Sequence, residues 1–138
     1  MVEENILCVV APALVNNGRY SLSQEELCRV PLVARERGSG TQQAVYDALS
    51  TTWIRRDSLR IVAVLDSNEA LKRAVIAEAG YAFVSAMSVA EEIANGQLSA
   101  VRIPGVAIKR RFFAVSRAGR ALSPAATAFQ AMMIARWR

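Results

Sequence analysis

The stretch Arg35–Thr41, RERGSGT, decides the fold because it joins an apolar run to a helical pattern. Pro31–Ala34 is typical of a short buried strand, and from Gln42 onward apolar residues recur at helical spacing. A strand that passes through Gly-Ser-Gly-Thr into a helix leaves several backbone N–H groups unpaired at the first helical turn. These donors and the positive end of the helix dipole favour an anion, such as a carboxylate, a sulfate or a phosphate.

Two explanations of this turn stay open when it is considered by itself. Ser39 and Thr41 are residue types favoured at helix N-termini, and Gly40 relieves strain, so simple capping accounts for them. Anion binding is the second explanation. The stretch is not a P-loop, because no Lys follows its second Gly. It also lacks the third Gly of a dinucleotide-binding turn.

The composition limits the classes of protein to consider. A chain of 138 residues that is 53% hydrophobic and 21% charged favours one globular core. Its apolar runs are shorter than a bilayer requires, and the acidic start Met1–Glu4 does not resemble a secretory signal. Cys8 and Cys28 are isolated in apolar contexts, which favours a reducing, cytoplasmic location. Without histidine or paired cysteines, we expect no metal site and no cofactor.

The charge distribution bears on nucleic-acid binding. The net charge is +5 and the isoelectric point is about 9.9, but the basic residues are scattered over separate predicted elements. No aromatic residues alternate with them, and no helix-turn-helix pattern is present. We therefore expect a solvated basic surface, or one that attracts small anions, and no DNA contact by this chain itself.

Apolar patterns and turn signals predict alternating strands and helices. Strands are expected at 5–11, 31–35, 59–65, 81–84, 98–103 and 106–116, and those at 31–35 and 59–65 are expected to be buried. Helices are expected after a cap at Ser21 or Ser23, from the glycine turn to about Arg55, after Asp66–Glu69, after a cap at Ser88, and from Pro124. Asn95–Gly96 and Pro104–Gly105 are expected to end elements, and a stripe containing Phe129 is expected to pack in the core. This alternation predicts a mainly parallel α/β sheet.

A second polar turn, Ser67–Asn68, follows the predicted strand at 59–65. Ligands of such sheets bind beyond the carboxyl ends of the strands. Right-handed connections would bring this turn to the same sheet edge as Ser39–Thr41. The two turns together raise the ligand explanation to equal standing with capping.

From Ile6 to Met133 the chain resembles the effector-binding domain of LysR-type transcriptional regulators. The stretch Arg35–Thr41 is similar to the family's Arg-Glu-Pro-Gly-Ser-Gly-Thr. Four further segments carry the resemblance by their order and spacing: 67–75, 80–85, 95–98 followed by Val101, and 118–126 followed by Phe129.

This resemblance implies a type 2 periplasmic-binding-protein-like fold, with two α/β lobes and an effector cleft between them. Residues 23–116 would form one complete lobe with its hinge strands, and residues 1–22 and 117–138 would be the ends of the other lobe. The DNA-binding helix-turn-helix, its linker helix and the opening units of the first lobe would lie upstream. We therefore expect a fragment with exposed apolar surface and a tendency to self-associate.

Two positions depart from the family pattern. Arg37 stands where the family has Pro, which adds a cation beside the predicted anion site and loosens the turn. Glu78 stands where a Gly is usual, and only Gly80 of that pair is retained. Both departures are expected to leave the fold intact and to prevent the transfer of any particular effector from the family.

The resemblance also implies a set of effector-binding residues. Ser39, Gly40 and Thr41 would hold the effector's anionic group through N–H and hydroxyl donors. Ser67 and Asn68 would contact it from the neighbouring turn, although capping of the next helix is the alternative for both. Arg35, like Arg37, would add charge-assisted bonds, with a salt-bridged or solvent-facing role as its alternative.

The implied function is the ligand-sensing portion of a bacterial LysR-type regulator, and not an enzyme. Its expected partners are a small anionic effector, either a carboxylate or an oxyanion, and further copies of itself in a homodimer or higher homo-oligomer. DNA would be contacted only through the missing N-terminal domain, and no membrane would be involved. The alternative is a solute-binding lobe of a transport-related protein without a DNA role. An upstream helix-turn-helix or an upstream signal peptide would distinguish the two.

Overall fold

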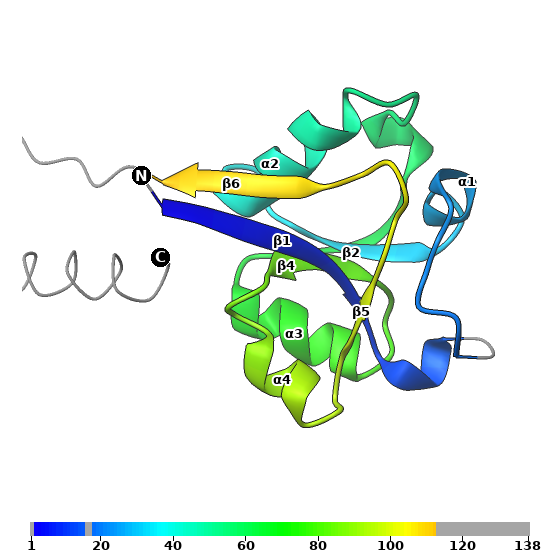
Figure 1. The fold of residues 1–138 in the computed structure, drawn as a ribbon, viewed down its shortest axis with the longest axis vertical. Helices are drawn as coiled ribbons and strands as arrows, with labels where there is room; N and C mark the ends of the chain where they lie inside the picture. The colour runs from blue at the N-terminus through cyan, green and yellow to red at the C-terminus, as the bar shows by residue number, and fades with distance from the viewer. Residues whose placement is uncertain (1, 16–17, 113–138) are drawn as a thin grey trace, which may run out of the picture.

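The computed structural model describes residues 2–15 and 18–112, which form a layered α/β unit (Figure 1). The strands are β1 (Val2–Val10), β2 (Pro31–Arg35), β3 (Arg60–Leu65), β4 (Ala82–Ser85), β5 (Ser99–Val101) and β6 (Ile108–Phe112). The helices are α1 (Gln24–Leu27), α2 (Gly40–Leu49), α3 (Asn68–Ile76) and α4 (Ala90–Ala94), with short 3-10 turns at Pro12–Leu14 and Arg56–Ser58. The helix predicted from Pro124, with its stripe at Phe129, lies outside the described residues.

The central strand is β1, which pairs antiparallel with β4, β5 and β6. By contrast, β2 and β3 pair in parallel. Two backbone bonds join β2 to the start of β4, from Val33 N–H to the Tyr81 oxygen and from Tyr81 N–H to the Pro31 oxygen, both 2.8 Å. The prediction of a mainly parallel sheet is therefore wrong for every pairing of β1. Crossover helices make β2 and β3 parallel, but they do not determine the direction of a strand that enters the sheet before them.

Two apolar cores lie on opposite faces of the sheet, with α2 over one face and α3 and α4 over the other (Figure 1). Alternate residues of β1 supply both cores, as a period of two residues requires. Ile6, Cys8 and Val10 face the α2 side, where Val45 and Leu49 pack. Val9 faces the α3 side, where the buried residues include Leu71, Val75 and Leu98. The helix predicted after Asp66–Glu69 is thereby confirmed as α3.

The strand β3 is not buried as predicted. Ile61, Val62 and Val64 are 37%, 47% and 60% exposed. Among the described residues β3 pairs only with β2, so it is an edge strand, and α3 covers only Ala63 and Leu65. Its run of Ile and Val is typical of a strand buried on both faces, but among the described residues only one face of β3 is covered by a helix.

The helix ends agree with the local signals in most places. Ser23 forms the predicted cap of α1, in a reciprocal capping box with Glu26. Ser88 is not the cap of α4, which begins after Val89, because the Ser88 hydroxyl donates to the Ser85 oxygen at 2.9 Å. Helix α2 ends at Leu49, earlier than the predicted Arg55.

Both predicted glycine breaks are present in the structure. Gly96 follows α4 with a φ of +83°, in the left-handed region that favours glycine. Gly105 separates β5 from β6 with a φ of +84°, at the third position of a turn closed by Val106 N–H and the Ile103 oxygen at 3.0 Å. No helix of the described residues is long and apolar enough to cross a membrane.

Candidate functional site

The first turn of α2 is built as the sequence predicts. Ser39 is the N-cap residue, and its hydroxyl accepts the Gln42 N–H at 3.2 Å. The capping explanation is therefore correct for Ser39, which is only 8% exposed. Gly40 and Thr41 occupy the first two helical positions, where the helix itself offers their N–H groups no acceptor. Capping and anion binding are compatible here, because the cap uses one donor and leaves two others.

Gln42, which is not among the predicted site residues, holds this turn against the end of β2. Its side-chain oxygen accepts the Arg35 N–H at 3.0 Å, and the residue is buried. A buried polar side chain in the first turn of an otherwise apolar helical pattern is the signal that points to this role.

The second polar turn lies beside the first, as predicted, because β2 and β3 are parallel neighbours in which Arg35 is opposite Leu65. Ser67 caps α3, and its hydroxyl accepts the Ala70 N–H at 3.0 Å. The Asn68 side-chain oxygen accepts a hydrogen bond from the Arg35 guanidinium, which links the two turns directly. Ser67 therefore has the capping role given as its alternative, whereas Asn68 supports Arg35.

Arg35 is salt-bridged, which was the alternative given for it. Its guanidinium donates to both carboxylate oxygens of Glu36, at 3.0 and 2.9 Å. This hydrogen bonding holds the pKa of Glu36 below its usual value, so Glu36 is charged at neutral pH. Arg37, the residue in place of the family's Pro, is exposed. Gly38 follows it with a φ of +100°.

Arg110 of β6 lies directly over the first residue of α2. A Cβ built on Gly40 would lie 2.7 Å from the Arg110 Cζ, so the guanidinium would have to shift to make room for any side chain at this position. Glu4 is opposite Arg110 in the pairing of β1 with β6, and it is only 5% exposed. Burial raises the pKa of Glu4, and the charge of Arg110 lowers it by a smaller amount.

Glu4 and Arg110 are not among the residues predicted for the site. The neighbours of Arg110 on β6, Lys109 and Arg111, are exposed and pair with Glu3 at 3.1 and 3.9 Å. The alternation of side chains along a strand turns Arg110 to the opposite face. That alternation is the signal that identifies it.

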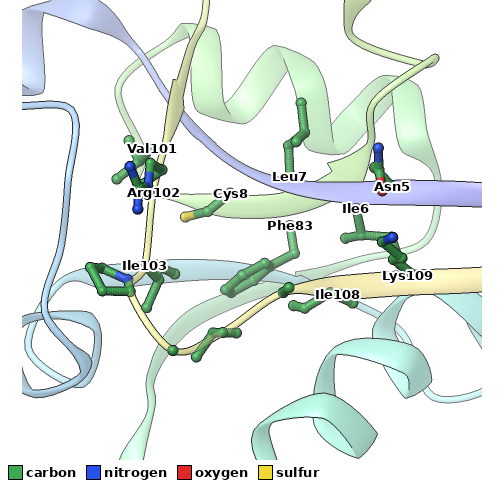
Figure 2. Close-up of a pocket in the computed structure, with 14 residues that line it drawn as sticks. Asn5, Ile6, Leu7, Cys8, Phe83, Val101, Arg102, Ile103, Ile108 and Lys109 are labelled. Carbon is green, nitrogen blue, oxygen red and sulfur yellow. The ribbon is translucent and has the colours of Figure 1, made fainter.

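The site therefore combines four features at one sheet edge: two free helical N–H donors, the hydroxyl of Thr41, the Arg110 guanidinium and the Arg35–Asn68 pair. Its chemistry is that of an anion site, since a helix N-terminus and a guanidinium both attract negative charge. A cavity with a volume of about 470 Å³ lies elsewhere, between β1, β5 and β6 (Figure 2). None of the six predicted site residues lines it. Among the described residues, no three His, Cys, Asp or Glu side chains are grouped as a metal site would need.

Comparison with known proteins shows the family. The sequence model of the LysR substrate binding domain matches residues 1–138, and the chain belongs to this family. The HTH-type transcriptional regulator CbbR of Sinorhizobium medicae (strain WSM419) is 36% identical over 117 residues, which cover 85% of this chain and 37% of that protein. The HTH-type transcriptional activator CmpR of Synechocystis sp. (strain ATCC 27184 / PCC 6803 / Kazusa) is 33% identical over 129 residues, covering 91% and 41%.

A solved structure agrees with this assignment. The regulatory domain of Synechocystis PCC6803 CcmR, in complex with 2-PG, superposes with a TM-score of 0.78 and 25% identity, over 99% of this chain and 64% of that one. The predicted type 2 periplasmic-binding-like fold and the ligand-sensing, non-enzymatic class are thus confirmed, and the transport-related alternative is not favoured. The chain spans about 37% of the first curated relative's length.

Proposed function

We propose that the chain is the ligand-sensing part of a bacterial LysR-type regulator and that it binds a small anionic metabolite at the first turn of α2. The observation that carries the proposal is the approach of Arg110 to Gly40, where the guanidinium and the free helical donors meet. The solved CcmR regulatory domain, whose ligand is 2-PG, supports an effector in this fold.

In this proposal the effector's anionic group accepts hydrogen bonds from the N–H groups of Gly40 and Thr41 and from the Thr41 hydroxyl. Arg110 adds a charge-assisted bond, and buried Glu4 balances the Arg110 charge when no effector is bound. Ser39 shapes the turn, while Ser67 and Asn68 hold its rim through the α3 cap and Arg35.

The remaining expectations concern the longer protein and are part of the same proposal. Residues 23–116 form the second lobe with its hinge strands, and residues 1–22 and 117–138 belong to the first lobe. Effector binding shifts the angle between the lobes and so the geometry of a cytoplasmic homodimer or higher homo-oligomer on DNA. DNA itself is bound by an N-terminal helix-turn-helix upstream of this chain.

Arg110→Gln tests the anion site, and Arg111→Gln on the exposed face of the same strand is its matched control. In a protein that includes the upstream first-lobe sequence, Arg110→Gln should weaken the binding of 2-PG, phosphate or a small dicarboxylate by about tenfold, because one charge-assisted bond is lost. Calorimetric titration measures the affinities. Arg111→Gln should change them by less than about twofold, as expected for an exposed charge.

Arg110→Gln also leaves Glu4 buried without its counter-charge, so a second variant separates folding from binding. The double variant Glu4→Gln with Arg110→Gln removes both charges and should fold stably while keeping the weakened anion affinity. Unchanged affinity in the folded double variant would exclude Arg110 from the site. If no anion of the panel binds the unmodified protein, the whole proposal is wrong.

A further inference from the structure

The cavity between β1, β5 and β6 lies where β1 changes its pairing partner. Cys8 pairs with Val101 of β5, and Ile6 pairs with Ile108 of β6. Ile6 and Cys8 are two residues apart on β1, whereas their partners Ile108 and Val101 are seven residues apart. The surplus residues bow away from β1 as an arch formed by residues 102–107, and the cavity lies beneath it (Figure 2).

The arch is held in place by backbone hydrogen bonds to a distant segment. Arg102 N–H donates to the Tyr20 oxygen at 2.9 Å, and the Arg102 oxygen accepts the Leu22 N–H at 2.8 Å. The Gly105 turn closes its tip, and the Gln24 side chain donates to the Pro104 oxygen at 3.4 Å. The cavity is therefore a preformed feature of the fold, as small-molecule sites usually are.

The cavity has an apolar floor and a basic rim. Buried side chains form the floor: Ile6, Cys8, Phe83, Ile103 and Ile108. Figure 2 shows Phe83 between the strands, below Cys8 and beside Ile108. Exposed Arg102 and Lys109 stand at the rim, and the described lining residues include no Asp or Glu.

The charges at the rim differ in their availability. Lys109 pairs with Glu3 at 3.1 Å, whereas Arg102 forms no salt bridge with any other described residue. Only the backbone of Arg102 takes part in the bonds that hold the arch. The floor adds no charge at neutral pH, because burial raises the pKa of the Cys8 thiol to about 12. An occupant with an apolar body and one negative charge matches this distribution.

We propose that this cavity is a second ligand site, which takes a compact apolar carboxylate such as an aryl or branched-chain acid. The apolar body lies on the floor beneath the arch, and the carboxylate lies at Arg102. A volume of about 470 Å³ is within the usual range for small-molecule sites, roughly 300–1,000 Å³. The site is separate from the α2 turn and does not depend on the function proposed for that turn.

The two sites share two strands, which gives the second site a physical link to the first. Ile6 and Ile108 line the cavity, and Glu4 and Arg110 are the next residues on the same face of the same pair of strands. A ligand that fixes the spacing of β1 and β6 beneath the arch therefore acts on the position of Arg110 over Gly40.

Calorimetric titration with benzoate tests the site, with inorganic phosphate as the control anion. Benzoate carries an apolar body that can lie on the floor, whereas phosphate offers only the charge. Benzoate should bind saturably, and phosphate should not displace it. No binding of benzoate, or equal competition by phosphate, would overturn the proposal.

Two variants sharpen the test through the thermal shift produced by benzoate. Arg102→Gln keeps the backbone bonds of the arch and should reduce benzoate affinity about tenfold, to that of uncharged benzyl alcohol. Ala107→Trp places a large side chain at an exposed lining position and should abolish the thermal shift. The control Arg111→Gln should behave as the unmodified chain. Benzoate binding that survives both lining variants would place the ligand elsewhere and refute the assignment.

Discussion

Glu78 holds a backbone conformation that glycine adopts more easily. Its φ is +67°, and it follows the C-cap of α3. The Glu78 N–H donates to the Val75 oxygen and the Ala79 N–H to the Ala74 oxygen, both at 3.0 Å, which is the Schellman pattern of helix ends. The sequence resemblance had marked this position as a usual glycine, and the geometry supplies the physical reason.

Glu78→Gly should therefore stabilise the chain by about 1 kcal/mol, because the left-handed conformation costs an L-residue side chain roughly that much. Urea unfolding followed by circular dichroism measures the change. Glu78→Ala, which removes the carboxylate but keeps the Cβ, is the control and should give little of the gain. Equal stabilisation by both variants would attribute the effect to charge instead.

Glu4 is a buried carboxyl whose pKa is raised by burial. An acid with a higher pKa in the folded state binds its proton more readily when folded, so its ionisation destabilises the fold. The contribution of Glu4 to the free energy of unfolding should therefore increase as the pH falls from neutral towards about 4.5, the pKa of this carboxyl in the unfolded chain. Glu4→Gln should flatten that part of the stability profile, whereas Glu3→Gln at the exposed neighbouring position should not. Unfolding free energies measured at a series of pH values distinguish the two variants.

At the scale of the element, β3 is an apolar edge strand that presents Val62 and Val64 to solvent. Exposed apolar edge strands tend to pair with other chains. The exposure of β3 could not be predicted from its own residues, because Ile and Val in a strand of a βαβ unit indicate burial. Whether an edge is covered depends on chain segments far away in the sequence.

Val64→Lys should reduce self-association of the chain, since a charge on an edge strand opposes the pairing of strands. Sedimentation velocity over a range of concentrations measures the effect. Ala94→Lys, the same charge on an exposed residue of α4, is the control and should leave association unchanged. An unaffected sedimentation profile in Val64→Lys would exclude β3 as the associating surface.

The parts of the site that sequence could predict are those determined within a few residues. The caps at Ser23 and Ser39 follow from side chains that accept a backbone N–H three positions onward. The approach of Arg110 to Gly40 depends on the pairing of β1 with β6, two strands at distant positions in the chain. The central place of β1 was unpredictable for the same reason.

At the scale of the whole molecule, the basic charges are distributed and many are already paired. Arg35 binds Glu36, Lys109 binds Glu3, and Lys72 binds Glu69 and Glu92. A surface that binds DNA without sequence preference needs a continuous set of available cations. The net charge of +5 does not supply such a set.

The chain by itself should therefore show no retardation of duplex DNA in a gel-shift assay at physiological ionic strength. The protein extended upstream through its proposed helix-turn-helix is the positive control and should bind. Binding by the 138-residue chain at that ionic strength would contradict this account of its charges.

The central place of β1 also determines how the molecule bears mechanical load. Its hydrogen bonds run along almost the full strand, to β6 near its start and to β4 and β5 towards its end. Tension applied at Val2 along the strand axis loads three ladders in shear at once instead of opening them one bond at a time. The N-terminal end of this domain is therefore a stiff attachment point, through which a pull is transmitted directly into the sheet.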